Sequence, residues 1–174
     1  GSLLSRSVKQ ALAGFGFNVM IVDDPVKDFA AAHNPNAREE IWNWWKTDAY
    51  TRMNGAYLLI VVGTRWHEDD LIGRILSPEY EGDPDLWEVI KFPAIATEHD
   101  VLGRAPGEPL LSPLFPDDTP EAALARWAEL RESVGEYTWQ ALYQQNPVSD
   151  KGSIFQLDKL RYYTSDPLSV RDDG

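Results

Sequence analysis

The fold is decided by residues 18–24, which read Asn-Val-Met-Ile-Val-Asp-Asp, an apolar run that leads directly into two carboxylates. A second apolar run, Tyr-Leu-Leu-Ile-Val-Val, occupies residues 57–62. Neither run alternates polar with apolar side chains, and such continuous runs are typical of strands buried on both faces of a parallel sheet. The sequence therefore predicts two buried strands, at residues 18–22 and 57–62.

A helix is predicted between the two strands. Ile41, Trp45 and Ala49 recur at helical spacing within residues 36–53, and Pro35 stands near the expected start. A strand, a helix and a second strand form the crossover unit that joins parallel strands. These elements predict an α/β fold built on a mainly parallel sheet with flanking helices.

Other segments complete this prediction. Helices are expected at residues 69–76, from Thr119 onward and at 137–145, and a third strand is expected at residues 86–92. The start of the chain is ambiguous, because Leu4, Val8, Ala11 and Leu12 also suit one helical face that ends at Gly14. Between residues 93 and 120 a proline-rich surface loop is expected, with Pro93, Pro106, Pro109, Pro113, Pro116 and Pro120. Residues 150–174 lack a core stripe, so they are expected to be a linker or tail after a domain of residues 1–149.

The composition restricts the function. The chain has 174 residues, of which 43% are hydrophobic and 25% charged, as in a folded globular domain. Its formal net charge of −12 argues against a compact, self-sufficient DNA-binding protein. Cysteine is absent, which excludes disulfides and thiolate metal sites. The longest apolar run, residues 56–62, is far shorter than the roughly 20 residues that cross a bilayer, so we expect neither a membrane span nor an export signal.

Asp23 and Asp24 are the first candidate site residues, because ligands bind beyond the carboxyl ends of the strands in open α/β sheets. In a nucleotide hydrolase, one acid would hold Mg²⁺ through its water shell and the next would orient or deprotonate the attacking water. The pattern suits a Walker B element. A strand that ends in two acids before Pro25 is also typical of a solvated turn, and this alternative stays open.

The second candidate is the segment that follows the second strand, Gly63-Thr64-Arg65-Trp66-His67-Glu68-Asp69-Asp70-Leu71. If the two strands are neighbours, Thr64 would hydrogen-bond a nucleotide phosphate or its water, and Arg65 would reach phosphate or neutralise Asp24. For the acids at residues 68–70 we favour capping of the next helix. No histidine spacing in the sequence supports a metal site at His67.

These residues resemble the large terminase subunit of tailed bacteriophages, the DNA-packaging ATPase and nuclease. The resemblance extends over about residues 14–155, with its blocks in the expected order. The matching blocks are Asn18-Val19-Met20-Ile21-Val22-Asp23-Asp24-Pro25-Val26-Lys27, Thr51-Arg52-Met53, residues 63–71, Phe92-Pro93-Ala94-Ile95 and Ala141-Leu142-Tyr143-Gln144-Gln145-Asn146-Pro147.

The resemblance implies roles for individual residues. Asp23 corresponds to the Mg²⁺-associated Walker B acid, and Asp24 occupies the catalytic-base position, where the family more often has glutamate. Thr64 matches the motif thought to couple nucleotide state to movement of DNA. The stretch Gly14-Phe15-Gly16 resembles a family loop that commonly carries a basic residue between its glycines, and Phe15 departs from that pattern.

The resemblance also implies a function. The parent protein would package double-stranded DNA into a procapsid by hydrolysing ATP with Mg²⁺, acting with a portal protein and a small terminase subunit. It would work in the cytoplasm of the bacterial host, at the procapsid portal. The implied fold is part of a P-loop NTPase, with residues 1–149 as the later half of the ATPase domain and residues 150–174 leading toward a nuclease domain that this chain does not contain.

A phosphate-binding loop of the Gly-x-x-x-x-Gly-Lys-Ser/Thr kind would hold the triphosphate, and the sequence contains none. Without it Asp23 and Asp24 have no triphosphate held against them. We therefore predict that this chain alone binds neither Mg²⁺ nor ATP tightly and hydrolyses ATP negligibly.

Two other functions remain open. One alternative is a noncatalytic interaction module from a defective prophage. The other is a stand-alone metal-dependent hydrolase that uses Asp23, Asp24 and Asp70. The tryptophans of residues 42–45 and Trp66 are expected to pack in a core rather than stack on bases, because the net charge is −12. An apolar sheet edge left uncovered is expected to cause self-association.

Overall fold

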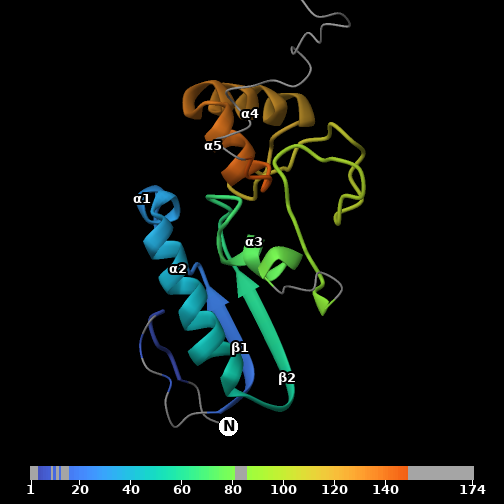
Figure 1. Ribbon diagram of the computed structural model, residues 1–174. Helices are drawn as coiled ribbons and strands as arrows, with labels where there is room; N and C mark the ends of the chain where they lie inside the picture. The colour runs from blue at the N-terminus through green and yellow to red at the C-terminus, as the bar shows by residue number, and fades with distance from the viewer. Residues whose placement is uncertain (1–3, 9, 11, 13–15, 81–85, 149–174) are drawn as a thin grey trace, which may run out of the picture.

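The computed structural model describes residues 4–8, 10, 12, 16–80 and 86–148. Figure 1 shows two strands with a long helix beside them at one end of the molecule, and two further helices at the other end. The elements in chain order are β1 (Phe17–Asp23), α1 (Phe29–His33), α2 (Pro35–Trp44), the π-helical turn η1 (Trp45–Ala49), the 3₁₀ turn η2 (Tyr50–Arg52), β2 (Met53–Val62), α3 (Leu71–Ile75), the 3₁₀ turn η3 (Pro78–Tyr80), α4 (Pro120–Val134), α5 (Glu136–Thr138) and the π-helical turn η5 (Trp139–Tyr143).

The two predicted strands and their parallel pairing are confirmed. β1 and β2 run in the same direction, with Met20 opposite Leu59 and Asp23 opposite Val62. The crossover between them consists of α1, α2, η1 and η2. The parallel register brings the carboxyl ends of both strands to the same edge of the sheet, where both arrowheads in Figure 1 point.

One face of the sheet forms the main core. Val22 packs with Ile41, Trp42 and Trp45 from the crossover helix and with Leu71 from α3. The partly buried side chains of Met20, Leu59 and Val61 pack against this cluster. The predicted helix at residues 36–53 is confirmed, although its last two turns are π and 3₁₀ in character. It begins where the side chain of Asn34 accepts hydrogen bonds from the next backbone amides and Pro35 occupies the first turn.

The expectation that both faces of the strands are buried is wrong for the described part of the chain. The second face consists of five apolar side chains that are between 38% and 62% exposed: Val19, Ile21, Leu58, Ile60 and Val62. We call these five residues the open sheet face. A strand with apolar side chains on both faces is suited to a sheet that helices cover on each side. Among the described residues, helices cover only one face of this sheet.

One further prediction is wrong, the strand at residues 86–92. Residues 87–92 have no regular structure, and Leu86 and Ile90 are well exposed. The backbone N–H of Phe92 donates to the side-chain Oε1 of Gln145 at 3.0 Å rather than to a strand, so tertiary contact overrides the local strand preference. At the ambiguous start of the chain, the described residues among 4–14 are not helical, and the other positions of that segment lie outside the described residues.

The proline-rich loop and the two last helices are confirmed. Residues 93–119 are irregular apart from an isolated antiparallel bridge between Ile95 and Pro109. α4 begins at the cap predicted for it, since Thr119 Oγ1 accepts a hydrogen bond from the backbone of Ala122 at 3.3 Å. The expected linker at residues 150–174 lies outside the described residues. No described helix is long and apolar enough to cross a membrane.

A second cluster of aromatic side chains holds this end of the molecule together. Trp127 of α4 packs against Trp139 and Tyr143 of η5, with ring centroids 6.1 and 6.0 Å apart. The indole N–H of Trp127 also donates to the carbonyl oxygen of Leu110 at 3.0 Å. Trp127 and Trp139 therefore pack in a cluster separate from the one that contains Trp42 and Trp45, and Trp127 fastens the proline-rich loop to α4.

Candidate functional site

The acids at the end of β1 lie beside the segment that follows β2. The backbone N–H of Asp24 donates to the carbonyl oxygen of Val62 at 2.9 Å, which extends the parallel pairing by one residue. The backbone N–H of Thr64 in turn lies 3.5 Å from Asp24 Oδ1, at the outer limit of a hydrogen bond. The predicted neighbourhood of Asp23, Asp24 and Thr64 is thus present at one edge of the sheet.

Asp24 has an unusual backbone conformation, with φ at +43°. This left-handed region is unfavourable for most residues with a side chain, and aspartate is among those that tolerate it best. The turn lets the chain leave the sheet toward Pro25 while the carboxylate reaches back to the segment after β2. Asp23 and Asp24 are both exposed, so their oxygens are open to a ligand that approaches this edge.

Arg65 does not neutralise Asp24, contrary to one of its expected roles. Its Nε donates to Asp70 Oδ2 at 2.8 Å, and Asp70 is only 3% exposed. Asp70 Oδ1 accepts from the backbone of Gly73 at 2.8 Å, so Asp70 is the N-cap of α3, as favoured for this acid. Burial raises the pKa of Asp70, and Arg65 opposes that shift. A Cβ at Gly73 would overlap the carbonyl oxygen of Glu68, so only glycine fits this close turn.

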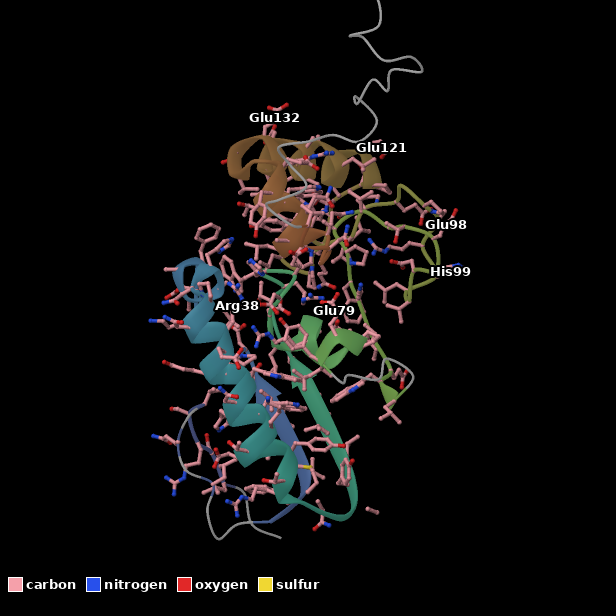
Figure 2. All side chains as sticks on the ribbon, in the orientation of Figure 1. Arg38, Glu79, Glu98, His99, Glu121 and Glu132 are labelled. Atoms are coloured by element: carbon pink, nitrogen blue, oxygen red, sulfur yellow. The ribbon has the colours of Figure 1, made fainter. Side chains whose placement is uncertain are left out.

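Asp69 joins α2 to α3 through two arginines. It accepts from Arg74 Nε at 2.7 Å and from Arg38 Nε at 3.0 Å, and Arg74 also reaches Glu39 of α2 at 2.7 Å. Arg38, labelled on α2 in Figure 2, further donates to the carbonyl oxygen of Ala32 at 2.6 Å. Burial alone would raise the pKa of Asp69, but hydrogen bonds from Arg74 and other neighbours lower it to about 2. The charges at this position are therefore structural.

His33, Trp66 and Tyr137 form a contact that sequence reasoning missed. The hydroxyl of Tyr137 donates to the carbonyl oxygen of Trp66 at 3.3 Å and is hydrogen-bonded to His33 Nε2 at 2.8 Å. The ring of His67 lies edge-on to that of His33, with centroids 5.3 Å apart. These residues come from distant positions in the chain, so no local spacing could have indicated the contact.

His67 is not placed as a metal ligand. Its Nδ1 accepts a hydrogen bond from the backbone of Asp69 at 2.9 Å. Burial lowers the pKa of His67, and the positive charges of Arg38 and His33 add to this shift. In the part of the chain that the structure describes, no three histidine, aspartate or glutamate side chains gather in a group that could hold a metal ion.

Two separate blocks of the terminase resemblance contact each other. The side-chain Oε1 of Gln144 accepts from the backbone of Ile95 at 2.9 Å, and its Nε2 donates to the carbonyl oxygen of Ile95 at 3.2 Å. The backbone N–H of Ala94 also donates to the carbonyl oxygen of Tyr143 at 2.8 Å. The blocks at residues 92–95 and 141–147 are therefore one structural unit.

Most of the chain matches a known protein family. A family model described as terminase large subunit, T4likevirus-type, N-terminal, matches residues 1–162. The chain belongs to this terminase family. A comparison with curated proteins found no match. The family is one of phage DNA packaging, so this terminase chain is assigned to that process at the level of its family.

Within the terminase chain, the family motif at residues 14–16 lies largely outside the described residues, which include only Gly16 of the three. The segment after β2 therefore carries the part of the candidate site that the structure describes best. It joins Asp24 through Thr64, α3 through Arg65 and α5 through Trp66.

Proposed function

We propose that this terminase chain carries the acidic half of an ATP-hydrolysing site that drives packaging of double-stranded DNA into a procapsid. The observation that carries the proposal is the meeting of Asp23 and Asp24, at the end of β1, with Thr64, at the end of the parallel strand β2. Ligands of open α/β sheets bind at this edge. As in the family, the parent protein would act with a portal protein and a small terminase subunit.

The exposed carboxylates fit a magnesium nucleotide. Mg²⁺ in such sites is held by one or two carboxylates together with substrate phosphates and water, and when bound it would neutralise charge on the phosphates. Asp23 would hold the ion through its water shell. Asp24 would orient or deprotonate the attacking water, and Thr64 would hydrogen-bond the phosphate or that water. Arg65 would have to leave Asp70 to reach a phosphate, since the two are paired at 2.8 Å.

A P-loop type of sheet is part of the same proposal. The parallel pair with its crossover helix is the repeating unit of such sheets, and the open sheet face is suited to a second helical layer. The phosphate-binding loop would come from a part of the protein outside this sequence. We therefore expect the chain alone to be inactive as an ATPase.

The stand-alone metal-dependent hydrolase is the weaker candidate. It requires Asp70 as a third ligand, but both carboxylate oxygens of Asp70 are already hydrogen-bonded, to Arg65 and to the backbone of Gly73. The interaction module is favoured by a specific observation, the open sheet face, and would need no chemistry at Asp23 or Asp24.

Calorimetric titration of the chain distinguishes these functions. With Mg²⁺-ATP we expect no binding tighter than about 1 mM, because several charge-assisted hydrogen bonds of about 1.5 to 3 kcal/mol each are missing without a phosphate-binding loop. Tight binding of Mg²⁺-ATP would contradict the proposed division of the site between two parts of the protein. Binding of Mg²⁺ without nucleotide, lost in Asp70→Asn, would favour the hydrolase.

A further inference from the structure

The segment after β2 needs a support that its own residues do not supply. Residues 63–67 have no regular secondary structure, although they carry Thr64 and Arg65. The Thr64 amide reaches Asp24 only at 3.5 Å, and the amide of Trp66 is bonded within the segment, to the carbonyl oxygen of Thr64 at 3.1 Å. Arg65 anchors the segment to the N-cap of α3, and Trp66 is the residue through which the segment contacts the other end of the molecule.

Tyr137 supplies a contact to Trp66 from the other end of the molecule. It lies on α5, 71 positions after Trp66, and its hydroxyl donates to the carbonyl oxygen of Trp66 at 3.3 Å. The hydroxyl oxygen of Tyr137 is also hydrogen-bonded to His33 Nε2, at 2.8 Å. Both hydrogen bonds end at the Tyr137 hydroxyl and join α5 to residues from the part of the chain that carries the sheet.

The ring of Tyr137 is held in place by its neighbours. Phe29 stacks on His33 with centroids 3.8 Å apart and meets the Tyr137 ring edge-on at 6.5 Å. The Nδ1–H of His33 donates to the carbonyl oxygen of Phe29 at 2.9 Å, so the Tyr137 hydroxyl donates to Trp66 when Nε2 of His33 also carries a proton and donates to that hydroxyl. Because these contacts hold the Tyr137 ring, its hydroxyl has a defined position. A hydrogen bond from this hydroxyl therefore restrains the position of the Trp66 carbonyl group.

We propose that Tyr137 is a positioning residue for the segment of residues 63–67, which it fastens to α5 through the carbonyl group of Trp66. A displacement of α5 is then passed to Thr64, two residues before Trp66. The structural part of this proposal stands on the contacts of Tyr137. Its consequence for ATP turnover rests on the proposed function.

The structural part is tested by NMR and amide hydrogen exchange on the chain itself. Tyr137→Phe keeps the ring and removes only the hydroxyl. The matched control is Tyr143→Phe, in η5, because the Tyr143 ring is packed against Trp139 but its hydroxyl makes no hydrogen bond to a described residue. The amide of His67 belongs to the same peptide group as the carbonyl of Trp66, so its chemical shift reports the contact directly.

For Tyr137→Phe we expect a changed His67 amide shift and amide exchange at residues 64–67 that is about 5- to 10-fold faster, as for the loss of one hydrogen bond. Tyr143→Phe should change neither. An unchanged His67 shift in Tyr137→Phe would overturn the proposal, and so would equal changes in both variants. A Tyr137→Phe chain that unfolds would be recognised by loss of shift dispersion throughout, and 3-fluorotyrosine at position 137, whose hydroxyl is a stronger donor, should then change the His67 amide shift in a folded chain. An unchanged His67 shift there would also overturn the proposal.

The functional part uses a complete terminase large subunit that contains this chain. There Tyr137→Phe should lower kcat for ATP several-fold while KM for ATP stays within about twofold, because a displaced Thr64 no longer aligns the attacking water while the phosphate-binding loop still holds the nucleotide. An unchanged kcat would overturn the functional part. The proposed function itself fails if Asp24→Asn does not lower ATP turnover in the complete subunit. In that case the positioning role of Tyr137 is decided by the His67 amide shift alone.

Discussion

At the residue scale, Asp69 shows how the motif after β2 is tied into the fold. It is paired with Arg38 of α2 and Arg74 of α3, and the side chain of Arg74 is only 5% exposed. Removing one partner of a buried ion pair leaves charges without compensation. We expect Asp69→Asn to lower the free energy of unfolding by about 3 kcal/mol. The control Glu79→Gln changes an exposed carboxylate on η3 (Figure 2) and should stay within about 0.5 kcal/mol.

Urea unfolding at neutral pH measures both variants, and equal effects of the two substitutions would contradict the structural role of Asp69. The same pair predicts a pH dependence. The folded pKa of Asp69, about 2, lies below the value of 3.8 that it has when unperturbed. Its contribution is therefore fully present above about pH 5 and is lost as the pH falls toward 2. The difference between the parent chain and Asp69→Asn should shrink over this range.

How far single residues are predictable from sequence depends on the distance of their partners. Asp70 was identified as a helix cap because its partner, Gly73, is three residues away. The sequence pattern does not predict the pairing of Arg65 with Asp70, because it also allows Asp24 as the partner of Arg65. Only the folded structure distinguishes the two acids. The contact of Tyr137 with Trp66 spans 71 positions and leaves no periodic trace.

At the scale of elements, Gln144 acts as a substitute for a neighbouring strand. Its amide makes with the backbone of Ile95 the two hydrogen bonds that a paired strand would make. Gln144→Leu leaves the N–H and C=O groups of Ile95 without these partners, at a cost of about 2 kcal/mol in the free energy of unfolding. Thermal unfolding together with exchange of the Ile95 amide measures the effect.

The control for Gln144 is Gln140→Leu, whose side chain bonds only Glu136 one helical turn away among the described residues. It should cost no more than about 0.5 kcal/mol. A Gln144→Leu chain with the stability of this control, and with slow exchange at Ile95, would show that the two terminase blocks are not joined in this way.

The elements that the sequence predicted correctly carry their signal locally. β1 and β2 are continuous apolar runs, and α2 and α4 each begin with a capping side chain followed by a proline in the first turn. The strand expected at residues 86–92 has the right residue types, but its last backbone amide is bonded to a glutamine side chain instead. The π-helical turns η1 and η5 have no known signal in composition, so sequence reasoning could not anticipate them.

At the scale of the whole molecule, the open sheet face is the largest departure from expectation. Exposed apolar surface of this kind promotes association. We expect the chain to self-associate at tens of micromolar, and Ile21→Lys, at a side chain that is 62% exposed, to shift it toward monomer. The control is Leu114→Lys, which changes an even more exposed apolar residue, 84%, in the proline-rich loop. Sedimentation velocity compares the three proteins, and a monomeric parent chain would contradict the expectation.

Asp24, held beside Thr64 at the edge of the sheet, is proposed as the catalytic base of a terminase ATPase. The most direct test is ATP turnover by a complete large subunit that contains this chain, with Asp24→Asn compared with Asp28→Asn. The control removes one charge nearby and leaves asparagine, a good helix cap, at the N-cap of α1. The account predicts that Asp24→Asn lowers kcat by about 100-fold or more while Asp28→Asn leaves it unchanged. Equal turnover in Asp24→Asn and the unaltered subunit would contradict it.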